Sequence, residues 1–216
     1  MKKSVTELMT ERHSARKFLT DKDVSEQDLQ AIVEAMRMSP ASYGMFNSQV
    51  IVIQRGEFLN ELAPIFYNQP NFVTASAYII LINDNGQKVK DVTIPRSADA
   101  IFGEMVDKRD RFVSNIDNVW NYKFGKEYAN MNPDEWSLKQ SYIALGIGTV
   151  AAADLGIDSC AQEGFDLVGL TKVLREKGLM DDDQNIALGL ALGYRDESFD
   201  KGKVRMPYEE YAKFVK

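Results

Sequence analysis

The sequence is poor in residues that form covalent or metallic cross-links. Its 216 residues include a single cysteine, Cys160, and a single histidine, His13. One cysteine cannot form a disulfide within the chain, so a reducing compartment is the simpler expectation. Because no cluster of histidine, cysteine and carboxylate residues has metal-ligand spacing, we predict no metal site.

Long apolar runs are also missing. The most hydrophobic stretch, residues 143–155, is broken by Gly146 and Gly148 and contains Asp154, so it is too short and too polar to span a bilayer. Residues 1–11 lack the continuous apolar stretch of a secretory signal. We therefore predict a cytoplasmic protein that does not associate with membranes.

The chain has no excess of positive charge. It carries 26 lysines and arginines against 32 acidic residues, a formal net charge of -6. Such a field repels nucleic-acid backbones, so we predict no nucleic-acid partner, and an anionic ligand must be held by local basic residues. The length suits one domain, residues 1–216, and no linker or internal repeat is visible.

Periodicity and capping signals predict two prominent helices. Ser25 followed by Asp28 resembles a capping box before an amphipathic helix that ends at Ser39-Pro40. A second helix opens at Pro133 and ends at Gly156. Its apolar residues lie nearly all round, so we expect a central, buried helix.

Three short apolar runs predict strands covered on both faces, at residues 50–53, 78–82 and 186–192. Few strands separated by helical stretches predict one layered unit, with helices packed on a small sheet. The tail, residues 200–216, has little of its own to fold around, so it should dock on another surface such as a second subunit.

Two basic clusters lie at opposite ends of the chain. Residues 12–18 contain Arg12, Arg16 and the hydroxyl of Ser14, and a second cluster contains Lys203 and Arg205. Guanidinium groups match phosphate oxygens bidentately, and a hydroxyl can complete the site. One phosphate held by both clusters would bring the two ends together. The alternative for residues 12–18 is a solvated basic turn.

These segments and others between them resemble the FMN-dependent nitroreductase family, specifically its oxygen-insensitive branch. The matching pieces, in order along the chain, are Arg12-His13-Ser14-x-Arg16, Ser39-Pro40-Ala41-Ser42 with Asn47-Ser48-Gln49, Glu135-Trp136 with Lys139-Gln140, Glu163-Gly164-Phe165-Asp166, and Lys203-x-Arg205-x-Pro207. The resemblance implies an α+β fold, a nitroreductase-like three-layer α/β/α sandwich with a small central sheet flanked by helices. It also implies a homodimer with a domain-swapped C-terminal tail and FMN at the subunit interface.

The resemblance assigns a cationic site for the FMN phosphate. Arg12, Lys203 and Arg205 would hold the phosphate, and Ser14 would support the phosphate or ribityl end beside His13. Arg16 would approach the pyrimidine edge of the isoalloxazine, where a fixed cation stabilises the negative charge of the reduced flavin.

Further positions would contact the flavin ring. Asn68 would hydrogen-bond the pyrimidine edge, while Glu163 and Gly164, after Gln162, would direct backbone N–H groups at flavin N5 and O4. Ser42 and Asn47 would reach the flavin of the other subunit.

Several of these residues have alternative interpretations. Asn68 suits a turn with Pro70, and Glu163-Gly164 suits an ordinary turn before a helix. His13 could act as a general acid. Cys160 fits a small buried apolar residue better than a redox centre, since no second cysteine exists.

The sequence departs from the family pattern at three places. Residues 43–46 lengthen the connection between Ser42 and Asn47, Val50-Ile51 follows Gln49 where a Pro-Trp pair is common, and Asn71 aligns where many relatives carry lysine. The aromatic residues Trp120, Tyr122, Phe124 and Tyr128 fall in the family's variable substrate-covering region. Their alternative is a surface helix with exposed aromatics.

The resemblance implies ping-pong turnover, in which NADH or NADPH gives hydride to flavin N5 and an acceptor then occupies the same face. No side chain need act as an obligatory base, and nitroaromatics and quinones are the expected acceptors. Two alternatives remain open: a specialised flavin enzyme of the same superfamily, and a non-catalytic protein that binds or stores flavin.

Overall fold

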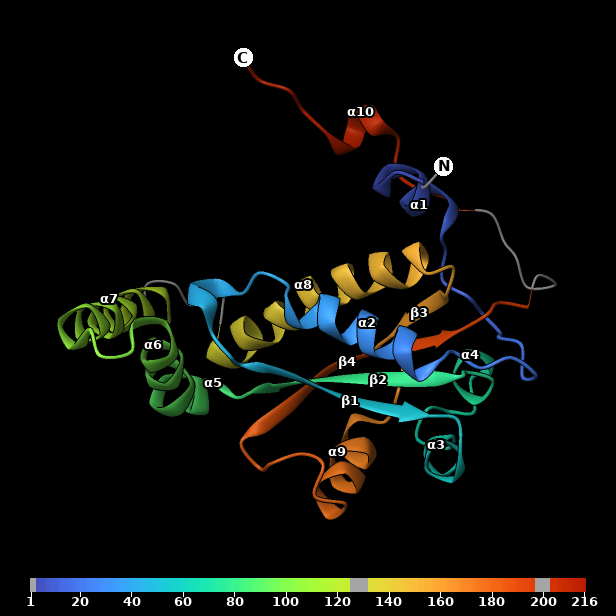
Figure 1. Cartoon of the computed structure of the whole chain (residues 1–216), viewed down its shortest axis with the longest axis horizontal. Coiled ribbons are helices and arrows are strands. Elements are labelled where there is room, and N and C mark those ends of the chain that lie inside the picture. The colour runs from blue at the N-terminus through green and yellow to red at the C-terminus, as the bar shows by residue number, and fades with distance from the viewer. Residues whose placement is uncertain (1–2, 125–131, 197–202) are drawn as a thin grey trace.

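The fold consists of three layers. The computed structural model describes residues 3–124, 132–196 and 203–216. A four-stranded sheet lies between two helical layers (Figure 1). One layer contains α2 (Glu26–Arg37) and α8 (Pro133–Asp154), and the other contains α3 (Glu57–Leu62), α4 (Pro70–Val73) and α9 (Leu167–Glu176). This arrangement confirms the predicted α+β sandwich.

The sheet has the order β1-β2-β4-β3, and all neighbouring pairs are antiparallel. The strands are β1 (Ser48–Gln54), β2 (Ala77–Asp84), β3 (Asp158–Gln162) and β4 (Gln184–Gly193). The prediction of strands covered on both faces holds for β2, where every residue is buried, but it is wrong for β1, which is a largely exposed edge strand. No pattern predicted β3, because its sequence contains no β-branched residue.

The central strand β2 supplies side chains to two cores because successive residues point to opposite faces. Tyr78 faces the α3, α4 and α9 layer, where it packs against the stacked rings of Phe66 and Phe72, whose centroids are 3.8 Å apart. Ile79 and Leu81 face the α2 and α8 layer. The need to bury both faces explains the unbroken apolar run of this strand.

The two predicted helices form with the expected caps. Ser25 Oγ accepts a hydrogen bond from the Asp28 N–H at 3.1 Å, and Asn132 and Glu135 complete a capping box at the start of α8. The expectation that α8 is buried all round is wrong for the single chain. Tyr142, Ile143 and Ile147 of this helix are 38 to 44% exposed, so the described residues cover this apolar part of α8 only partly.

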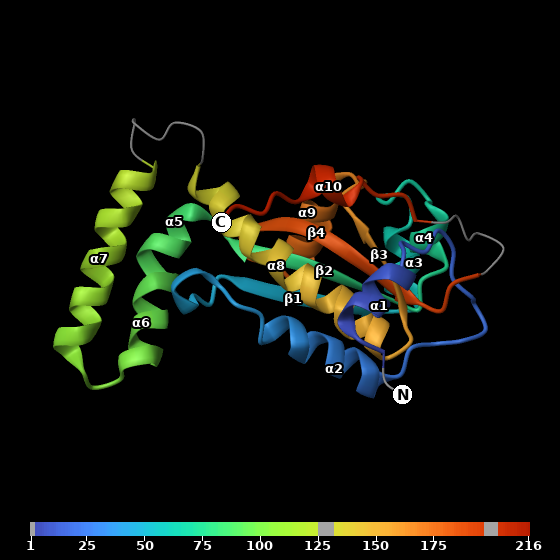
Figure 2. The same cartoon turned by 90° about the horizontal axis from the view of Figure 1, so that it is seen from above.

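A pair of helices, α6 (Ile94–Phe102) and α7 (Val106–Phe124), stands apart from the sheet (Figure 2). It follows the short α5 (Gly86–Lys88) and the π-helical turn η2 (Val89–Thr93). The lengthened connection, which contains the 3-10 turn η1 (Ser42–Gly44), packs against this pair, because Met45 lies in the same buried cluster as Ile116 and Trp120.

The predicted aromatic segment belongs largely to α7. Trp120 and Phe124 pack edge-on against Trp136, with ring centroids 5.8 and 6.2 Å away. Trp120 is therefore buried and not a surface aromatic. Tyr122 lies in α7, where only its backbone is described, and Tyr128 lies outside the described residues.

The two ends of the chain contrast with the sheet. Neither α1 (Val5–Glu11) nor α10 (Tyr208–Tyr211) contains a buried residue, and the tail leads away from the body of the domain (Figure 1). Phe214 and Val215 are 82 and 93% exposed. Among the described residues, no helix is both long enough and apolar enough to cross a membrane, and no group of ligating side chains could hold a metal ion.

Candidate functional site

The N-terminal basic segment lies along the free edge of β3. Ser14 forms a parallel bridge with Ser159, and the Ala15 N–H donates to the Ser159 carbonyl at 3.1 Å. Phe18 anchors the end of the segment, packing against Gly193 so closely that a Cβ there would lie 2.8 Å from its ring. These contacts place residues 12–16 beside the strand that leads to Gln162.

Arg12, Lys203 and Arg205 form what we call the open cation cluster. Arg12 caps the end of α1, and Lys203 Nζ donates to the Met9 carbonyl. Burial and then repulsion from Arg205 lower the pKa of Arg12, and burial followed by the charges of Arg12 and Arg205 lowers the pKa of Lys203. None of the three forms an ion pair with a carboxylate in the described parts of the chain. The charge of Asp158 offsets part of this repulsion at Arg12, but among the described residues no carboxylate pairs with the three cations, so they are suited to an anionic ligand.

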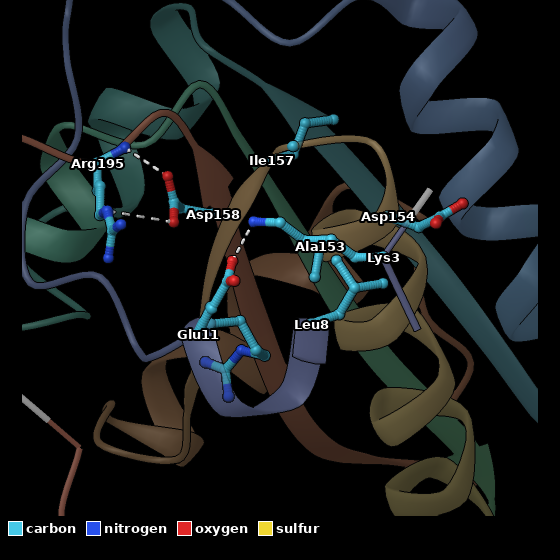
Figure 3. A pocket seen from close by; sticks show the side chains of 10 residues that line it. Lys3, Leu8, Glu11, Ala153, Asp154, Ile157, Asp158 and Arg195 are labelled. Atoms are coloured by element: carbon cyan, nitrogen blue, oxygen red, sulfur yellow. Dashed lines mark hydrogen bonds and ion pairs between the residues drawn. The ribbon is translucent and has the colours of Figure 1, made fainter. Parts of the chain in front are cut away.

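Arg12 also borders a cavity of about 390 Å³ between α1, the end of α8 and the start of β3 (Figure 3). Two ion pairs are drawn there, Lys3 with Glu11 and Arg195 with Asp158. The guanidinium of Arg195 also lies 2.7 Å from His13 Nε2. His13 is thus placed against a cation, beside the cluster.

The turn after β3 is held from two sides. Gln69 Nε2 donates to the Gly164 carbonyl at 2.6 Å, and the Tyr142 hydroxyl donates to Glu163 Oε1 at 2.8 Å. Burial, followed by the hydrogen bond to Glu163, raises the pKa of Tyr142 to about 12. The Gly164 backbone and the Glu163 side chain are therefore both held in place.

Gln162 precedes this turn with a buried amide that lacks partners. The residue is 6% exposed, and neither Oε1 nor Nε2 has a hydrogen-bond partner among the described residues. A buried polar group without partners costs free energy, and such groups are rare in native proteins. The unpartnered amide is consistent with a ligand atom near the end of β3.

Asn68 lies at a strained turn before α4. Both Tyr67 and Asn68 have left-handed backbone conformations, with φ of 54° and 51°. Strain of this kind concentrates at functional sites. The side chains of Asn68 and Arg16 are exposed, and in the described chain neither has a hydrogen bond or ion pair.

Ser42 and Asn47 lie on another side of α8. The Ser42 N–H donates to Gln140 Oε1 at 3.0 Å, whereas Glu163 is bound by Tyr142. Two residues along an α-helix differ by about 200° around its axis, so α8 stands between Ser42 and Glu163 within one chain.

The side chain of Asn47 points into the domain. It is 1% exposed, and Nδ2 donates to the Ser137 hydroxyl at 2.9 Å. Nδ2 thus joins the residue before β1 to the start of α8, whereas the buried Oδ1 has no hydrogen-bond partner among the described residues, so a contact of Asn47 with a partner's flavin stays a prediction.

Sequence reasoning missed two residues of this region, Gln69 and Tyr142. Tyr142 lies in a helix whose sequence is largely apolar, and its polar hydroxyl is the signal that could have identified it. Gln69 adjoins Asn68, but only the fold brings it to Gly164, a residue 95 positions away.

Comparison with known proteins agrees with this geometry. The model of the nitroreductase family matches residues 9–194. A Staphylococcus aureus protein with the provisional name NAD(P)H nitroreductase is 30% identical, with 100% of this chain and 97% of the relative covered.

Solved structures show the same fold at lower identity. A nitroreductase-like protein from Streptococcus mutans has a TM-score of 0.79 at 16% identity, covering 98% of each chain. A provisionally named nitroreductase from Exiguobacterium sibiricum, solved in complex with FMN, has a TM-score of 0.75 at 21% identity, covering 99% of this chain and 98% of that one. The chain therefore belongs to the nitroreductase family, a family of oxidoreductases.

Proposed function

We propose that the protein is an FMN-dependent oxidoreductase that takes hydride from NADH or NADPH and passes it to nitroaromatic, quinone or similar electron-poor acceptors. The observation that carries the proposal is the open cation cluster at the end of α1. A terminal phosphate carries the negative charge that would neutralise these cations. The sequence contains no Gly-x-Gly-x-x-Gly fingerprint, so this motif gives no reason to expect a dinucleotide in place of FMN.

The residues that would contact FMN follow the edge of β3, from the phosphate end of the cofactor to its ring. Arg12, Lys203 and Arg205 would hold the phosphate, with Ser14 supporting the ribityl end from the edge of β3. From Ser159 to Gln162 the strand rises about 10 Å, so the turn at Glu163 lies well beyond the phosphate end. That separation leaves room for a ribityl chain followed by a ring.

The remaining residues would orient the ring. Glu163 and Gly164 would present backbone N–H groups to its N5 and O4 edge, and the unpartnered amide of Gln162 lies beside them. Arg16 and Asn68 would bind the pyrimidine edge, where Arg16 stabilises negative charge. Asn71 supplies no second cation, because its amide is uncharged, and its Nδ2 donates to Cys160 Sγ at 3.2 Å.

Bound FMN would supply the chemistry of accepting and releasing hydride at N5. The protein's own residues bind and orient the reactants, so no side chain is required as an obligatory base. His13, held against Arg195, would help to order the phosphate site without acting as a general acid.

We also propose a homodimer of single-domain subunits, 1–216. Three features support a partner: the exposed apolar face of α8, the exposed tail, and the position of Ser42 across α8 from Glu163. A swapped tail would cover the partner while Lys203 and Arg205 hold the phosphate. Ser42 of one subunit would then approach the flavin of the other. An interface of this kind buries on the order of 2,000 Å².

The cofactor and the activity are tested together. The purified protein should release FMN on denaturation, and anaerobic NADH or NADPH should bleach its yellow colour. Menadione should then restore the colour. Release of FAD would contradict the phosphate site, and colour that persists with both nicotinamides would identify a flavin-binding or storage protein. A panel of nitroaromatic and quinone acceptors then separates a broad reductase from a specialised flavin enzyme.

The assembly is tested by sedimentation velocity with flavin absorbance recorded alongside. The full-length protein should sediment as a flavin-loaded dimer, and deletion of residues 208–216 should weaken both dimer and flavin binding. A flavin-loaded monomer would refute the shared site.

A further inference from the structure

A second cavity, of about 380 Å³, lies beside the lengthened connection at residues 43–46. The end of α2 and the first turn of α6 complete it. Two arginines, Arg37 and Arg96, line the cavity, and among the described residues that form it there is no carboxylate. Met36, Met45 and Phe46 provide apolar lining. The cavity therefore combines positive charge with a surface suited to a flat ring.

The two arginines differ in what they already bind. Arg37 holds Glu34 through two hydrogen bonds of 2.7 Å, so its charge is compensated. Arg96 is exposed and has neither a hydrogen bond nor an ion pair within the described part of the chain. Its guanidinium carbon lies 6.0 Å from the centroid of the Phe46 ring. Arg96 is thus the cation available to a ligand.

The cavity lies beside Ser42, because Gln140, which accepts a hydrogen bond from the Ser42 N–H, is one of its lining residues. The Phe46 N–H donates to Ser97 Oγ at 3.1 Å, which ties the connection to α6. Ala41, the neighbour of Ser42, lines the cavity. Under the proposed function Ser42 approaches the partner's flavin, so the cavity would open beside that flavin. This step rests on the proposed function.

We propose that this cavity binds the anionic group of a substrate, with Arg96 pairing with a carboxylate or phosphate and Phe46 contacting the attached ring. A guanidinium matches both groups bidentately and also stacks on aromatic faces. The anion has two sources, the carboxylate of an aromatic acceptor or the 2′-phosphate of NADPH. Arg96 acts by binding, and no covalent step involves it.

Binding is measured without turnover. The oxidised holoprotein is titrated calorimetrically with 4-nitrobenzoate and with its neutral methyl ester. Arg96→Gln should weaken 4-nitrobenzoate binding about fivefold and leave the ester unchanged, because an exposed charge pair contributes up to about this factor. Arg96→Lys should retain part of the affinity. Arg111→Gln, an exposed arginine of α7 outside the cavity, changes net charge equally and should alter neither ligand.

A second arm separates the two sources of the anion. A KM for NADPH that rises in Arg96→Gln while the KM for NADH stays constant identifies the 2′-phosphate as the group bound. A selective loss of 4-nitrobenzoate binding identifies the carboxylate. If Arg96→Gln and Arg111→Gln behave alike in both arms, the proposal is overturned. A protein that contains no flavin yet still binds 4-nitrobenzoate through Arg96 would refute the proposed function and leave the cavity assignment standing.

Discussion

Two cationic sites in this molecule, Lys88 and the open cation cluster, have opposite surroundings. Lys88 is largely buried and forms ion pairs with Asp84, Asp181 and Asp183 at 3.5, 3.3 and 2.7 Å. Burial by itself would lower the pKa of Lys88, but the hydrogen bond to Asp183 and the charge of Asp84 raise it. The open cation cluster has no such carboxylates in the described chain, and the pKa values of Arg12 and Lys203 are lowered.

The difference separates a structural charge from a binding charge. The ion pairs around Lys88 join the end of β2 to the loop before β4, so they serve the fold whether or not a ligand is present. The open cation cluster joins the two ends of the chain, which have no buried residues in α1 or α10. A bound anion would relieve its repulsion further, so an anionic ligand is expected to stabilise it.

The largest effect is expected where the charge is structural. Lys88→Met should lower the free energy of unfolding by about 2 to 4 kcal/mol, because it leaves the buried carboxylate of Asp84 without its cation. Urea unfolding measures the loss. Lys172→Met removes an exposed lysine that lies 3.8 Å from Glu176, and it should change stability by less than about 0.5 kcal/mol. Equal stabilities for the two variants would contradict a structural role.

In the open cation cluster the expected effect is on the ligand. Arg205→Ala should weaken FMN binding roughly ten- to a hundredfold, or about 1.5 to 3 kcal/mol, because a charge-assisted bond to phosphate is lost. Quenching of flavin fluorescence on adding apoprotein gives the affinity. Lys213→Ala removes the same charge elsewhere in the tail and is the matched control. Unchanged affinity in Arg205→Ala would show that the phosphate lies elsewhere.

Two smaller effects of opposite sign are expected at Gln162, one on the stability of the apoprotein and one on FMN binding. Gln162→Leu removes a buried amide without partners, so the apoprotein should become more stable by about 1 kcal/mol. FMN binding should weaken about fivefold if the amide contacts the ring. Thermal unfolding of apo and holo forms reports both changes. A variant that loses apoprotein stability and keeps its FMN affinity would remove Gln162 from the site.

The smallest expected effect is a dependence of FMN affinity on pH, which arises from the titration of Lys203. Its pKa is lowered in the apoprotein and should rise when phosphate binds, so binding takes up a proton as pH passes the lowered value. FMN affinity should therefore fall with rising pH in the alkaline range, beginning below the ordinary lysine pKa of about 10.4. Lys203→Met should bind more weakly at neutral pH and lack this step. A step that persists in Lys203→Met would assign it to another group.

Local signals predicted local structure well. Ser25, Asn132 and Glu135 act as caps because the hydrogen bonds they form span only three residues. The apolar runs around Tyr78 and Ile186 predicted β2 and β4. For β3, pairing with β4 and with residues 14–15 defines the strand, and composition carries no signal for such pairing.

Long-range placement was harder to predict. The spacing of Ser42 and Asn47 in the sequence gave no reason to expect different environments for the two residues. The Asn47 amide nevertheless points inward to Ser137, while Ser42 lies near the surface. The lengthened connection at residues 43–46 gains its role only by packing Met45 against α7.

The sequence by itself determined which residues can bind a phosphate and where helices begin, because those properties depend on side-chain chemistry and on neighbours a few positions away. Only the tertiary structure decided that Lys203 meets α1 at Met9, and that α8 divides Ser42 from Glu163. These placements depend on contacts between residues nearly two hundred positions apart, as between Met9 and Lys203. Such contacts form because burying the two faces of one small sheet decides which parts of the chain lie side by side.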